Sequence, residues 1–491
     1  MKEKIILATV NAKKDLYAIT SDEFSAIAPN IQMGLLAEYA RSKGLEVLVV
    51  ESDVDGISYD GLMDIVEKEK PSLFGIICSG ANPSSSTMVV AGVVDFFVRF
   101  HERQMKVKTF IWGAHPTVLP ERTLRETGAH FVVRGEGYQT IVDLARFLNG
   151  NHPAGMESIS GLSFLSDPAD FKNATYAQTP DSVLLDDLNV LPPIDWSRMD
   201  PRRYRAHNWH TFGDMDHRSP YAIIWTSFGC PFKCNFCSIN NLFGKRIQRF
   251  RSIDNVVKEI DILVKQHGVR HIKILDELFV ANARRIEEFC DRLDERGYDL
   301  NMWGYSRVDT ISRHLLKRLK KVGMNWISYG FESATDAVLH GAEKGCKNMD
   351  VDGVIRMTKD EGVSICADVM FGLWDEDMDA LKRTYDFLVK YNFEWANMYP
   401  VFGYPGTKLF EKVEGAIDWK TYALYGYDCR PLPTKHLTSA QVLRFRDEAF
   451  MRYHSRPEYL SMLEKRFGAP TRAHIERMVA LPLKRRILEQ S

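Results

Sequence analysis

The sequence predicts an α/β fold with a doubly wound parallel sheet first, a partial (β/α)6 barrel second and a small helical C-terminal module. Short apolar runs alternate with amphipathic stretches five times in residues 1–150 and six times in residues 221–409. Beyond residue 416 the apolar residues take helical spacing. We therefore expect domains at 1–150, 220–415 and 416–491, with residues 151–219 as a linker or strap between the first two.

Composition places the chain among ordinary soluble globular proteins, because 45% of its 491 residues are hydrophobic and 26% are charged. The longest apolar stretch, Val89 to Val98, is far shorter than the roughly 20 residues of a membrane span. Residues Met1 to Val10 lack the pattern of a secretory signal, which predicts a cytoplasmic protein. The net charge of −1 gives no support for nucleic acid binding.

The first unit is predicted to be a Rossmann-like sheet with helices between its strands. Its expected strands are Ile5–Val10, Glu46–Glu51, Leu73–Cys78, Thr109–Trp112 and Phe131–Val133. Residues 31–42 are expected to form a helix, because Leu35, Leu36 and Tyr39 lie at helical spacing. Gly44 then provides a stop.

Small residues follow the third, fourth and fifth of these strands. A doubly wound sheet binds ligands at the carboxyl ends of its strands, and small residues let a large flat ligand approach the backbone. Ordinary turn chemistry, with Ser84–Ser86 capping a helix, is the alternative explanation. The candidate binding residues are Ser79, Gly80, Gly113, His115, Pro116, Gly135, Glu136 and Gly137.

The second unit is predicted to be a barrel of six parallel strands. Its expected strands are Ala222–Trp225, His271–Leu275, Asn301–Tyr305, Trp326–Tyr329, Ser364–Met370 and Trp395–Tyr399. A hairpin near Gly161–Leu165 and a linker at Leu191–Pro193 are expected before it. In barrels of this kind the chemistry is carried by residues just after the strand ends.

Three cysteines, Cys230, Cys234 and Cys237, lie within eight residues directly after the first barrel strand. Three thiolates on one loop can hold three irons of a 4Fe-4S cluster, which leaves the fourth iron open to an exogenous ligand. An open iron is what catalysis requires. A zinc site is the alternative, and its fourth ligand would come from His207, His210, His217 or Cys290.

The pattern Cys-x3-Cys-x-aromatic-Cys resembles the signature of radical S-adenosylmethionine enzymes. The resemblance implies that the three cysteines hold the cluster and that S-adenosylmethionine binds its open iron. The segment Tyr329–Ser333 is similar to the family's segment after the fourth strand, whereas Asp276 and Glu277 follow the second strand without the usual Gly-Gly-Glu. The implied S-adenosylmethionine-binding residues are Phe236, Asp276, Glu277, Arg307, Glu332 and Ser333.

The loops Gly113–Thr117 and Arg134–Gly137 resemble those of the cobalamin-binding domain that precedes the barrel in one branch of this superfamily. The first-strand loop, Asn11–Tyr17, has no histidine. The resemblance therefore implies cobalamin with its own base displaced and no protein histidine below cobalt. His115 belongs to a different loop, and it either contacts the cofactor or fills the loop. The related methylthiotransferases of transfer RNA carry three cysteines in this domain, whereas this one has only Cys78.

The resemblance implies a cobalamin-dependent radical S-adenosylmethionine enzyme, and within that branch it favours a methyltransferase acting on an unactivated carbon. A 5′-deoxyadenosyl radical would abstract a substrate hydrogen, and the carbon radical would take a methyl group from methylcobalamin. The implied cofactors are a 4Fe-4S cluster, S-adenosylmethionine and cobalamin. The implied partners are a small-molecule substrate and an electron donor such as flavodoxin or ferredoxin. The motifs assign no general acid or base.

Two alternatives to methyl transfer remain open. Cyclases and rearrangement enzymes use the same two cofactors without transferring a methyl group. A non-catalytic cobalamin sensor or iron–sulfur electron carrier is the alternative of another class. An open iron argues against a carrier, which four protein ligands would serve better.

The C-terminal module is expected to begin with a helix capped by Thr438 and Gln441. The apolar stripe that follows is Val442, Phe445, Ala449, Phe450 and Tyr453. Such a stripe is typical of core packing, here on the barrel. Substrate recognition by this module is the alternative.

Overall fold

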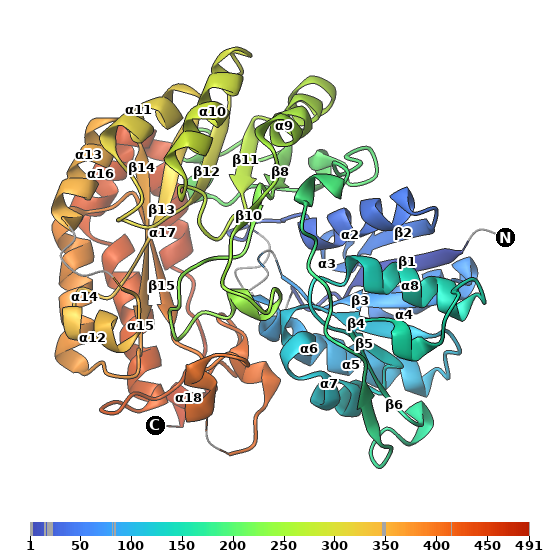
Figure 1. The fold of residues 1–491 in the computed structure, drawn as a ribbon. Helices are drawn as coiled ribbons and strands as arrows, with labels where there is room; N and C mark the ends of the chain where they lie inside the picture. The colour runs from blue at the N-terminus through green and yellow to red at the C-terminus, as the bar shows by residue number, and fades with distance from the viewer. Residues whose placement is uncertain are drawn as a thin grey trace.

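The computed structural model describes residues 3–13, 16, 23–80, 82, 85–345, 350–413 and 415–490. Two α/β units lie side by side and are joined by an extended strap, and the C-terminal helices pack against the second unit (Figure 1). Among these residues, no helix is both long enough and apolar enough to cross a membrane. The predicted fold class is confirmed.

The N-terminal sheet has the strand order β2-β1-β3-β4-β5-β6-β7. Its strands are β1 Lys4–Thr9, β2 Glu46–Glu51, β3 Leu73–Ile77, β4 Thr109–Trp112, β5 Phe131–Val133, β6 Leu162–Leu165 and β7 Tyr176–Gln178. The pairings among β1 to β5 are parallel, and β6 and β7 add antiparallel strands beside β5. All five predicted strands are present, and the predicted hairpin forms β6 and β7 and continues this sheet to Gln178.

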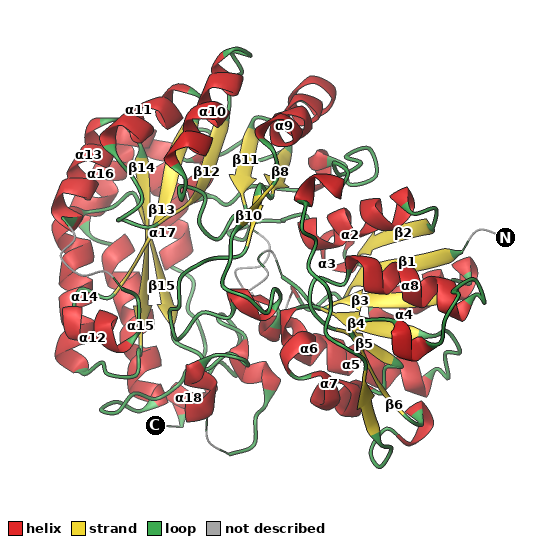
Figure 2. Ribbon diagram, viewed as in Figure 1, coloured by secondary structure: helices red, strands yellow, loops and turns green. Residues whose placement is uncertain are grey.

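Helices cover both faces of this sheet (Figure 2). They are α2 Ile31–Ser42, α3 Ser52–Asp55, α4 Tyr59–Glu69, α5 Val90–Glu102, α6 Ala114–Val118, α7 Pro120–Thr127 and α8 Tyr138–Leu148. Alternate residues of β1 point to opposite faces: Ile5 belongs to the core beneath α2 and α8, and Ile6 to the core beneath α4 and α5. Helix α2 has its predicted bounds, and the Asn30 side chain caps it by accepting from the Met33 N–H at 3.0 Å.

The second unit is a six-stranded parallel sheet with the order β15-β14-β13-β12-β11-β8. Its strands are β8 Tyr221–Ile224, β11 His271–Ile274, β12 Asn301–Ser306, β13 Met324–Glu332, β14 Ser364–Phe371 and β15 Trp395–Pro400. Its helices are α9 Ile253–His267, α10 Ala283–Asp294, α11 Arg313–Lys321, α12 Asp336–Gly341, α13 Val351–Asp360 and α14 Met378–Tyr391. Strands β8 and β15 do not pair with each other, so the barrel is partial, as predicted.

Aromatic side chains close the amino-terminal end of the barrel. The Trp209 ring, from the strap, lies 4.8 Å from that of Trp303 and 5.2 Å from that of Trp326, centroid to centroid. Phe467, at the end of a C-terminal helix, stacks on Trp326. These rings fill the barrel below the middle of its strands.

The C-terminal helices are α15 Ser439–His454, α16 Pro457–Phe467, α17 Ala469–Val479 and α18 Arg486–Glu489. The predicted capping box between Thr438 and Gln441 starts α15. This helix packs on β15, because the Arg446 Nε donates to the Met398 carbonyl at 2.7 Å and the Tyr453 hydroxyl donates to the Phe393 carbonyl at 2.8 Å.

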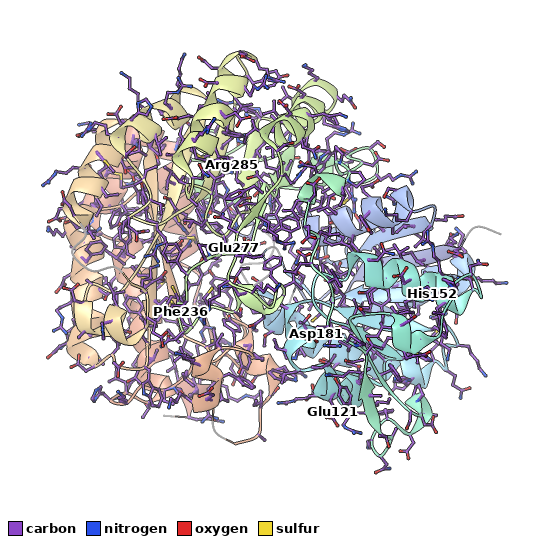
Figure 3. All side chains as sticks on the ribbon, in the orientation of Figure 1. Glu121, His152, Asp181, Phe236, Glu277 and Arg285 are labelled. Atoms are coloured by element: carbon purple, nitrogen blue, oxygen red, sulfur yellow. The ribbon has the colours of Figure 1, made fainter. Side chains whose placement is uncertain are left out.

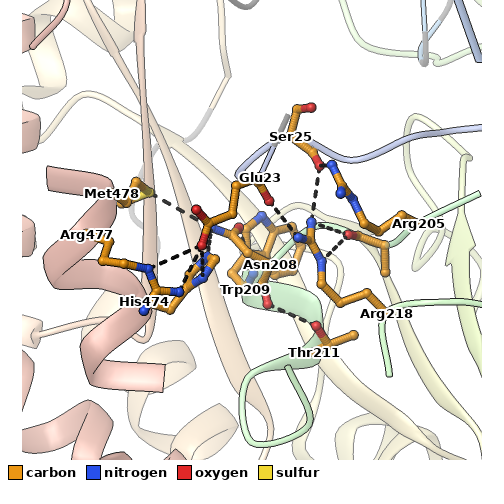
Figure 4. A network of polar contacts seen from close by, with 11 residues as sticks. Glu23, Ser25, Arg205, Asn208, Trp209, Thr211, Arg218, His474, Arg477 and Met478 are labelled. Carbon is orange, nitrogen blue, oxygen red and sulfur yellow. Dashed lines mark hydrogen bonds and ion pairs between the residues drawn. The ribbon is translucent and has the colours of Figure 1, made fainter. Parts of the chain in front are cut away.

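A polar network joins the N-terminal unit, the strap and α17 (Figure 4). The Glu23 carboxylate accepts from Arg477 at 2.8 Å, and the Glu23 carbonyl accepts from Arg218 of the strap at 2.8 Å. Asn208 of the strap hydrogen bonds to His474 of α17 at 3.2 Å. The segment that precedes α2 is therefore tied to the end of the chain.

Replacement of Glu259 by Ala is expected to destabilise the barrel strongly. Arg251 Nη1 lies 2.7 Å from Glu259 Oε2, and both side chains are 1% exposed. Removing one member of a buried ion pair leaves the other charge uncompensated, at a cost of about 3–5 kcal/mol. Urea and thermal unfolding monitored by circular dichroism would measure the change.

Glu476→Ala is the matched control, because the Glu476 to Arg472 pair is exposed. Its expected cost is below about 1 kcal/mol. Equal midpoints for the two variants would contradict the assignment of the Arg251 to Glu259 pair as a structural anchor.

Candidate functional site

The three cysteines lie on a loop that two short strands hold in place. These strands, β9 Ser227–Phe228 and β10 Arg249–Phe250, pair antiparallel on either side of the loop, and sequence patterns did not predict them. The Asn240 Oδ1 accepts from the Cys230 N–H at 3.4 Å, and the Cys237 N–H donates to the Cys234 carbonyl at 3.2 Å. Gly229 has φ +85°, and a Cβ there would lie 2.4 Å from the Ile247 carbonyl oxygen. The loop conformation thus depends on its own backbone contacts.

The donor set of this loop fits a 4Fe-4S cluster. All three thiols are free, with Cys230 and Cys234 half-buried and Cys237 exposed. Burial raises the pKa of the Cys230 and Cys234 thiols, while the nearby charge of Arg307 opposes that rise. Among the described residues no three His, Cys, Asp or Glu side chains converge on the position of a single ion. Cluster ligation needs no such convergence, because each thiolate binds a different iron.

The residues considered as a fourth zinc ligand are engaged elsewhere. His210 bonds to the Asn301 carbonyl at 3.0 Å, and His217 pairs with Asp214 at 2.6 Å. His207 stacks on Trp209. Cys290 is fully buried in α10. The contacts of these four side chains give no support to the zinc alternative.

Asp276 and Glu277, at the carboxyl end of β11, differ in what they bind. Asp276 is 1% exposed and accepts three hydrogen bonds of 2.6 Å, from the backbone and hydroxyl of Thr226 and from the Ser227 hydroxyl. Glu277 accepts from the Gly229 N–H at 3.2 Å, and its buried Oε1 has no hydrogen-bond partner among the described residues. Burial raises the pKa of Glu277 to about 8. Glu277 is thus the member of the pair with an acceptor to offer to the amino group of a ligand.

Arg307, after β12, is held against the cysteine loop. Its guanidinium donates to both carboxylate oxygens of Asp309 at 2.8 Å and to the Lys344 carbonyl at 3.1 Å. The guanidinium carbon lies 3.8 Å from the centre of the Phe232 ring. The bidentate partner in the structure is therefore Asp309, and a ligand carboxylate at Arg307 stays a prediction.

Glu332, the last residue of β13, and Ser333, directly after it, have separate partners. Glu332 has φ +63° and pairs with the buried Lys344 at 2.6 Å. Ser333 donates to Glu376 at 3.1 Å, and Glu376 accepts from the Gly372 and Leu373 N–H groups. Lys344 was missed by sequence analysis, because no local pattern links it to Glu332.

The predicted S-adenosylmethionine residues therefore gather around the cysteine loop at one end of the barrel. Phe236 is half-buried on that loop and packs against the apolar cluster that includes Val338 and Leu373. In the view of Figure 3, Phe236 and Glu277 lie toward the middle of the molecule, whereas Glu121 and His152 lie at its periphery. Contact of each residue with the cofactor stays a prediction.

The predicted cobalamin residues gather at the carboxyl edge of the N-terminal sheet, after β3, β4 and β5. The three glycines after β4 and β5 have positive φ angles, and their missing Cβ atoms face the protein itself. At Gly113 a Cβ would lie 2.2 Å from the Cys78 carbonyl oxygen, at Gly135 2.8 Å from Ser182 and at Gly137 2.6 Å from the Trp112 Nε1. These contacts explain the glycines by turn chemistry, the alternative given above.

Two buried polar atoms at this edge have no partner among the described residues, which fits an edge that receives a ligand. They are the Nε2 of His115 and the Nε2 of Gln32, whose Oε1 accepts from Ser79. His115 also bonds to Thr87 through Nδ1, at 3.2 Å, and burial lowers its pKa to about 3, so the ring is neutral. Pro116 is buried beside it in α6.

A cavity of about 90 Å³ lies where the connections of β1 and β3 diverge, the usual ligand position in such sheets. Thr9, Asp53, Ser79, Gly80 and His207 are among its lining residues. In the first-strand loop, Lys14, Asp15 and Tyr17 lie outside the described residues. The absence of a histidine below cobalt stays a prediction.

Contacts between the two units place the carboxyl edge of the N-terminal sheet beside the cysteine loop. Glu136 is 2% exposed and forms an ion pair with Arg249 of β10, and it also accepts from the Leu185 N–H at 2.8 Å. The His115 ring packs edge-on against Trp419, 4.6 Å between centroids. Asn82, after β3, hydrogen bonds to Lys273 and Tyr305 inside the barrel. Glu136 therefore holds the interface rather than facing a free cofactor surface.

Two protein-family models match the chain. The radical SAM superfamily model matches residues 226–388, and the B12 binding domain model matches residues 18–145. The limits of the four predicted domains stay predictions.

Curated relatives match most of the chain. An uncharacterized methyltransferase of Pyrococcus horikoshii, PH0819, is 26% identical over 438 residues, which is 88% of this chain and 89% of the relative. The anaerobic magnesium-protoporphyrin IX monomethyl ester cyclase of Rubrivivax gelatinosus is 26% identical over 81% of this chain and 69% of its own.

Solved structures share the fold. The methyltransferase TsrM of Kitasatospora setae, with cobalamin and a 4Fe-4S cluster bound, superposes with a TM-score of 0.64 at 16% identity, covering 83% of this chain and 74% of that one. The cobalamin-dependent enzyme OxsB superposes with a TM-score of 0.61 at 17% identity, covering 86% of this chain and 55% of that one. The chain matches both family models, and its fold is that of a solved enzyme with the same two domains. It therefore belongs to the radical S-adenosylmethionine enzymes that carry an N-terminal cobalamin-binding domain.

Proposed function

We propose that this enzyme transfers a methyl group to an unactivated carbon of a small molecule. The proposal rests on one observation: the carboxyl edge of the N-terminal sheet contacts the carboxyl end of the barrel. The loop after β3 reaches Tyr305 inside the barrel, and α6 lies beside the 3-10 turn Ile239–Asn241 that follows the cysteine loop. Parallel sheets bind ligands at these edges, so two ligands bound there would face each other across the interface.

When bound, the 4Fe-4S cluster and S-adenosylmethionine supply a 5′-deoxyadenosyl radical, and cobalamin supplies a methyl group. The protein's own residues bind the cofactors and exclude water from the site. The thiols of Cys230, Cys234 and Cys237 hold the cluster, and the unpartnered Oε1 of Glu277 accepts from the amino group of S-adenosylmethionine. The buried contacts of Glu136 and His115 keep water from the interface between the units. A flavodoxin or ferredoxin would provide the electron.

The names of several relatives favour methyl transfer. Besides PH0819, the cytidylyl-2-hydroxyethylphosphonate methyltransferase of Streptomyces wedmorensis is 20% identical over 74% of this chain. The relative from Rubrivivax gelatinosus is a cyclase. Cyclisation without methyl transfer is therefore the second candidate function, on the strength of that relative.

The deciding experiment is anaerobic. The full chain, reconstituted with iron, sulfide and cobalamin, would be incubated with reductant, trideuteromethyl-labelled S-adenosylmethionine and a small-molecule extract. Methyl transfer predicts 5′-deoxyadenosine together with a deuterated product. Formation of 5′-deoxyadenosine with a product that has lost hydrogen and gained no deuterium would replace methyl transfer by cyclisation. A protein that forms neither product would refute both candidates.

Changing Cys234 to Ala is expected to abolish 5′-deoxyadenosine formation and to leave cobalamin binding intact, because the thiol lies in the barrel and the cobalamin edge in the other unit. Iron content, absorption of bound corrinoid and product analysis measure the three properties. Cys290→Ala, in the buried face of α10, is the control and should retain the cluster. Loss of corrinoid together with the cluster in Cys234→Ala would contradict this division of the two sites.

Changing Glu277 to Gln is expected to weaken S-adenosylmethionine binding by about 10- to 100-fold, because the ammonium group of this ligand favours the ionised carboxylate and Gln cannot ionise. Equilibrium titration of the cluster-loaded wild type and variant with S-adenosylmethionine measures the two dissociation constants and so this ratio. Asp276→Asn is the comparison: its three hydrogen bonds lie within the protein, so it should lower the unfolding midpoint. If Glu277→Gln binds as tightly as the wild type, the amino group is held elsewhere.

A further inference from the structure

Lys273 is a buried cation in the middle of the barrel. It lies on β11 and is 2% exposed, and its Nζ donates to the Oδ1 of Asn82, which enters from the N-terminal unit. The Nζ also lies 4.9 Å from the centre of the Trp303 ring and 5.5 Å from that of Tyr305. An ammonium group has three N–H donors, and Asn82 takes one of them.

No carboxylate of the described residues forms an ion pair with Lys273. Asp368, across the barrel on β14, acts on it only at longer range. Both oxygens of Asp368 are occupied, by the Ser328 hydroxyl at 2.6 Å and the Asn397 amide at 2.8 Å. Burial without a counter-ion lowers the pKa of Lys273 to about 7. The barrel therefore holds a buried amine that no carboxylate of the described residues pairs with directly.

The space beside Lys273 can admit a ligand. Tyr399, on β15, shares the inner face of its strand with Asn397, and its side chain is 38% exposed. Tyr305 is only half-buried, although it lies on the inner face of β12 between two neighbouring strands. The amino-terminal end of the barrel is closed by aromatic side chains. The exposure of these two tyrosines on its inner face therefore indicates space in the lumen above that end.

Lys273 lies deeper than the residues expected to hold S-adenosylmethionine. Lys273 lies within β11 and precedes Glu277, which follows the carboxyl end of that strand, by four residues, and Tyr305 precedes Arg307 by two. The same deeper level receives Asn82 from the cobalamin-binding unit. A ligand at this level would thus touch both units without occupying the cofactor positions.

We infer that Lys273 binds an oxyanion, a carboxylate or a phosphate, of the small-molecule substrate. The inference rests on the proposed function for the existence of such a substrate, and it adds the chemistry by which the substrate is held. The oxyanion accepts the two N–H donors of Lys273 that Asn82 leaves free, and Asn82 positions the ammonium group from the other unit. Trp303 and Tyr305 bound the pocket beside it.

The test measures the ionisation of Lys273 in the full chain loaded with cluster and cobalamin. Brief labelling with trace acetic anhydride over a range of pH, followed by peptide mass spectrometry, reports the unprotonated fraction of this amine. Benzoate and inorganic phosphate serve as probes, with chloride at equal ionic strength as the control. The titratable groups that act on Lys273 are Asp368 and Glu277. His207 of the strap is close enough for Lys273 to lower its pKa, and Tyr305 lies beside the ammonium group.

Pairing with an oxyanion stabilises the protonated amine, so either probe should raise the pH of half-maximal labelling by one unit or more. At pH 7 labelling then falls about fivefold for a one-unit rise from a midpoint of 7. Lys317, exposed on α11, should label equally with and without the probes. Calorimetric titration should detect benzoate binding to the wild type and to Lys273→Arg, and not to Lys273→Met.

Three results would overturn the inference. One is labelling of Lys273 that neither probe changes, and another is no labelling at any pH, which would show that ligands cannot reach the amine. The third is the same shift produced by S-adenosylmethionine alone or by loading of cobalamin alone, which would assign the oxyanion to a cofactor. A probe-dependent shift in a protein that transfers no methyl group would refute the proposed function and leave the oxyanion site standing.

Discussion

The arrangement of the site depends on one buried ion pair between Glu136 and Arg249. Glu136 lies three residues after β5, the last parallel strand of the cobalamin-binding unit, and Arg249 belongs to the ribbon that encloses the cysteine loop. The two charges compensate each other across the interface, where the Glu136 side chain is 2% exposed and that of Arg249 is 12% exposed. The pair therefore ties the ribbon of the cysteine loop directly to the edge of the other sheet.

The lumen of the barrel changes in character along its axis. At the carboxyl end are ionisable groups, among them Glu277 and the ion pair of Glu332 with Lys344. The middle level carries Lys273 and Asp368, and the amino-terminal end is filled by tryptophan and phenylalanine rings. The ionisable groups and the aromatic rings therefore lie at opposite ends of the barrel.

Patterns within about ten residues of sequence predicted the strands, helix α2, the capping box at Thr438 and the cysteine loop, because hydrophobic period, capping and metal-ligand spacing are local properties. The sequence could not reveal pairings across long separations. Lys273 and Asn82 are 191 residues apart, and Glu136 and Arg249 are 113 apart. The ribbon of β9 and β10 is two residues long on each side, too short for any period to appear.

The contact of Glu23 with Arg477 has a consequence for biosynthesis. Glu23 lies on the connection between β1 and α2, and its partner is 454 residues later in the chain. A ribosome delivers the N-terminal unit first, so its sheet can form early while this connection still lacks its anchors in the strap and α17. The anchor of Glu23 on α17 is therefore made only after one of the last helices has emerged, so this part of the N-terminal unit reaches its final contacts after the barrel has been synthesised.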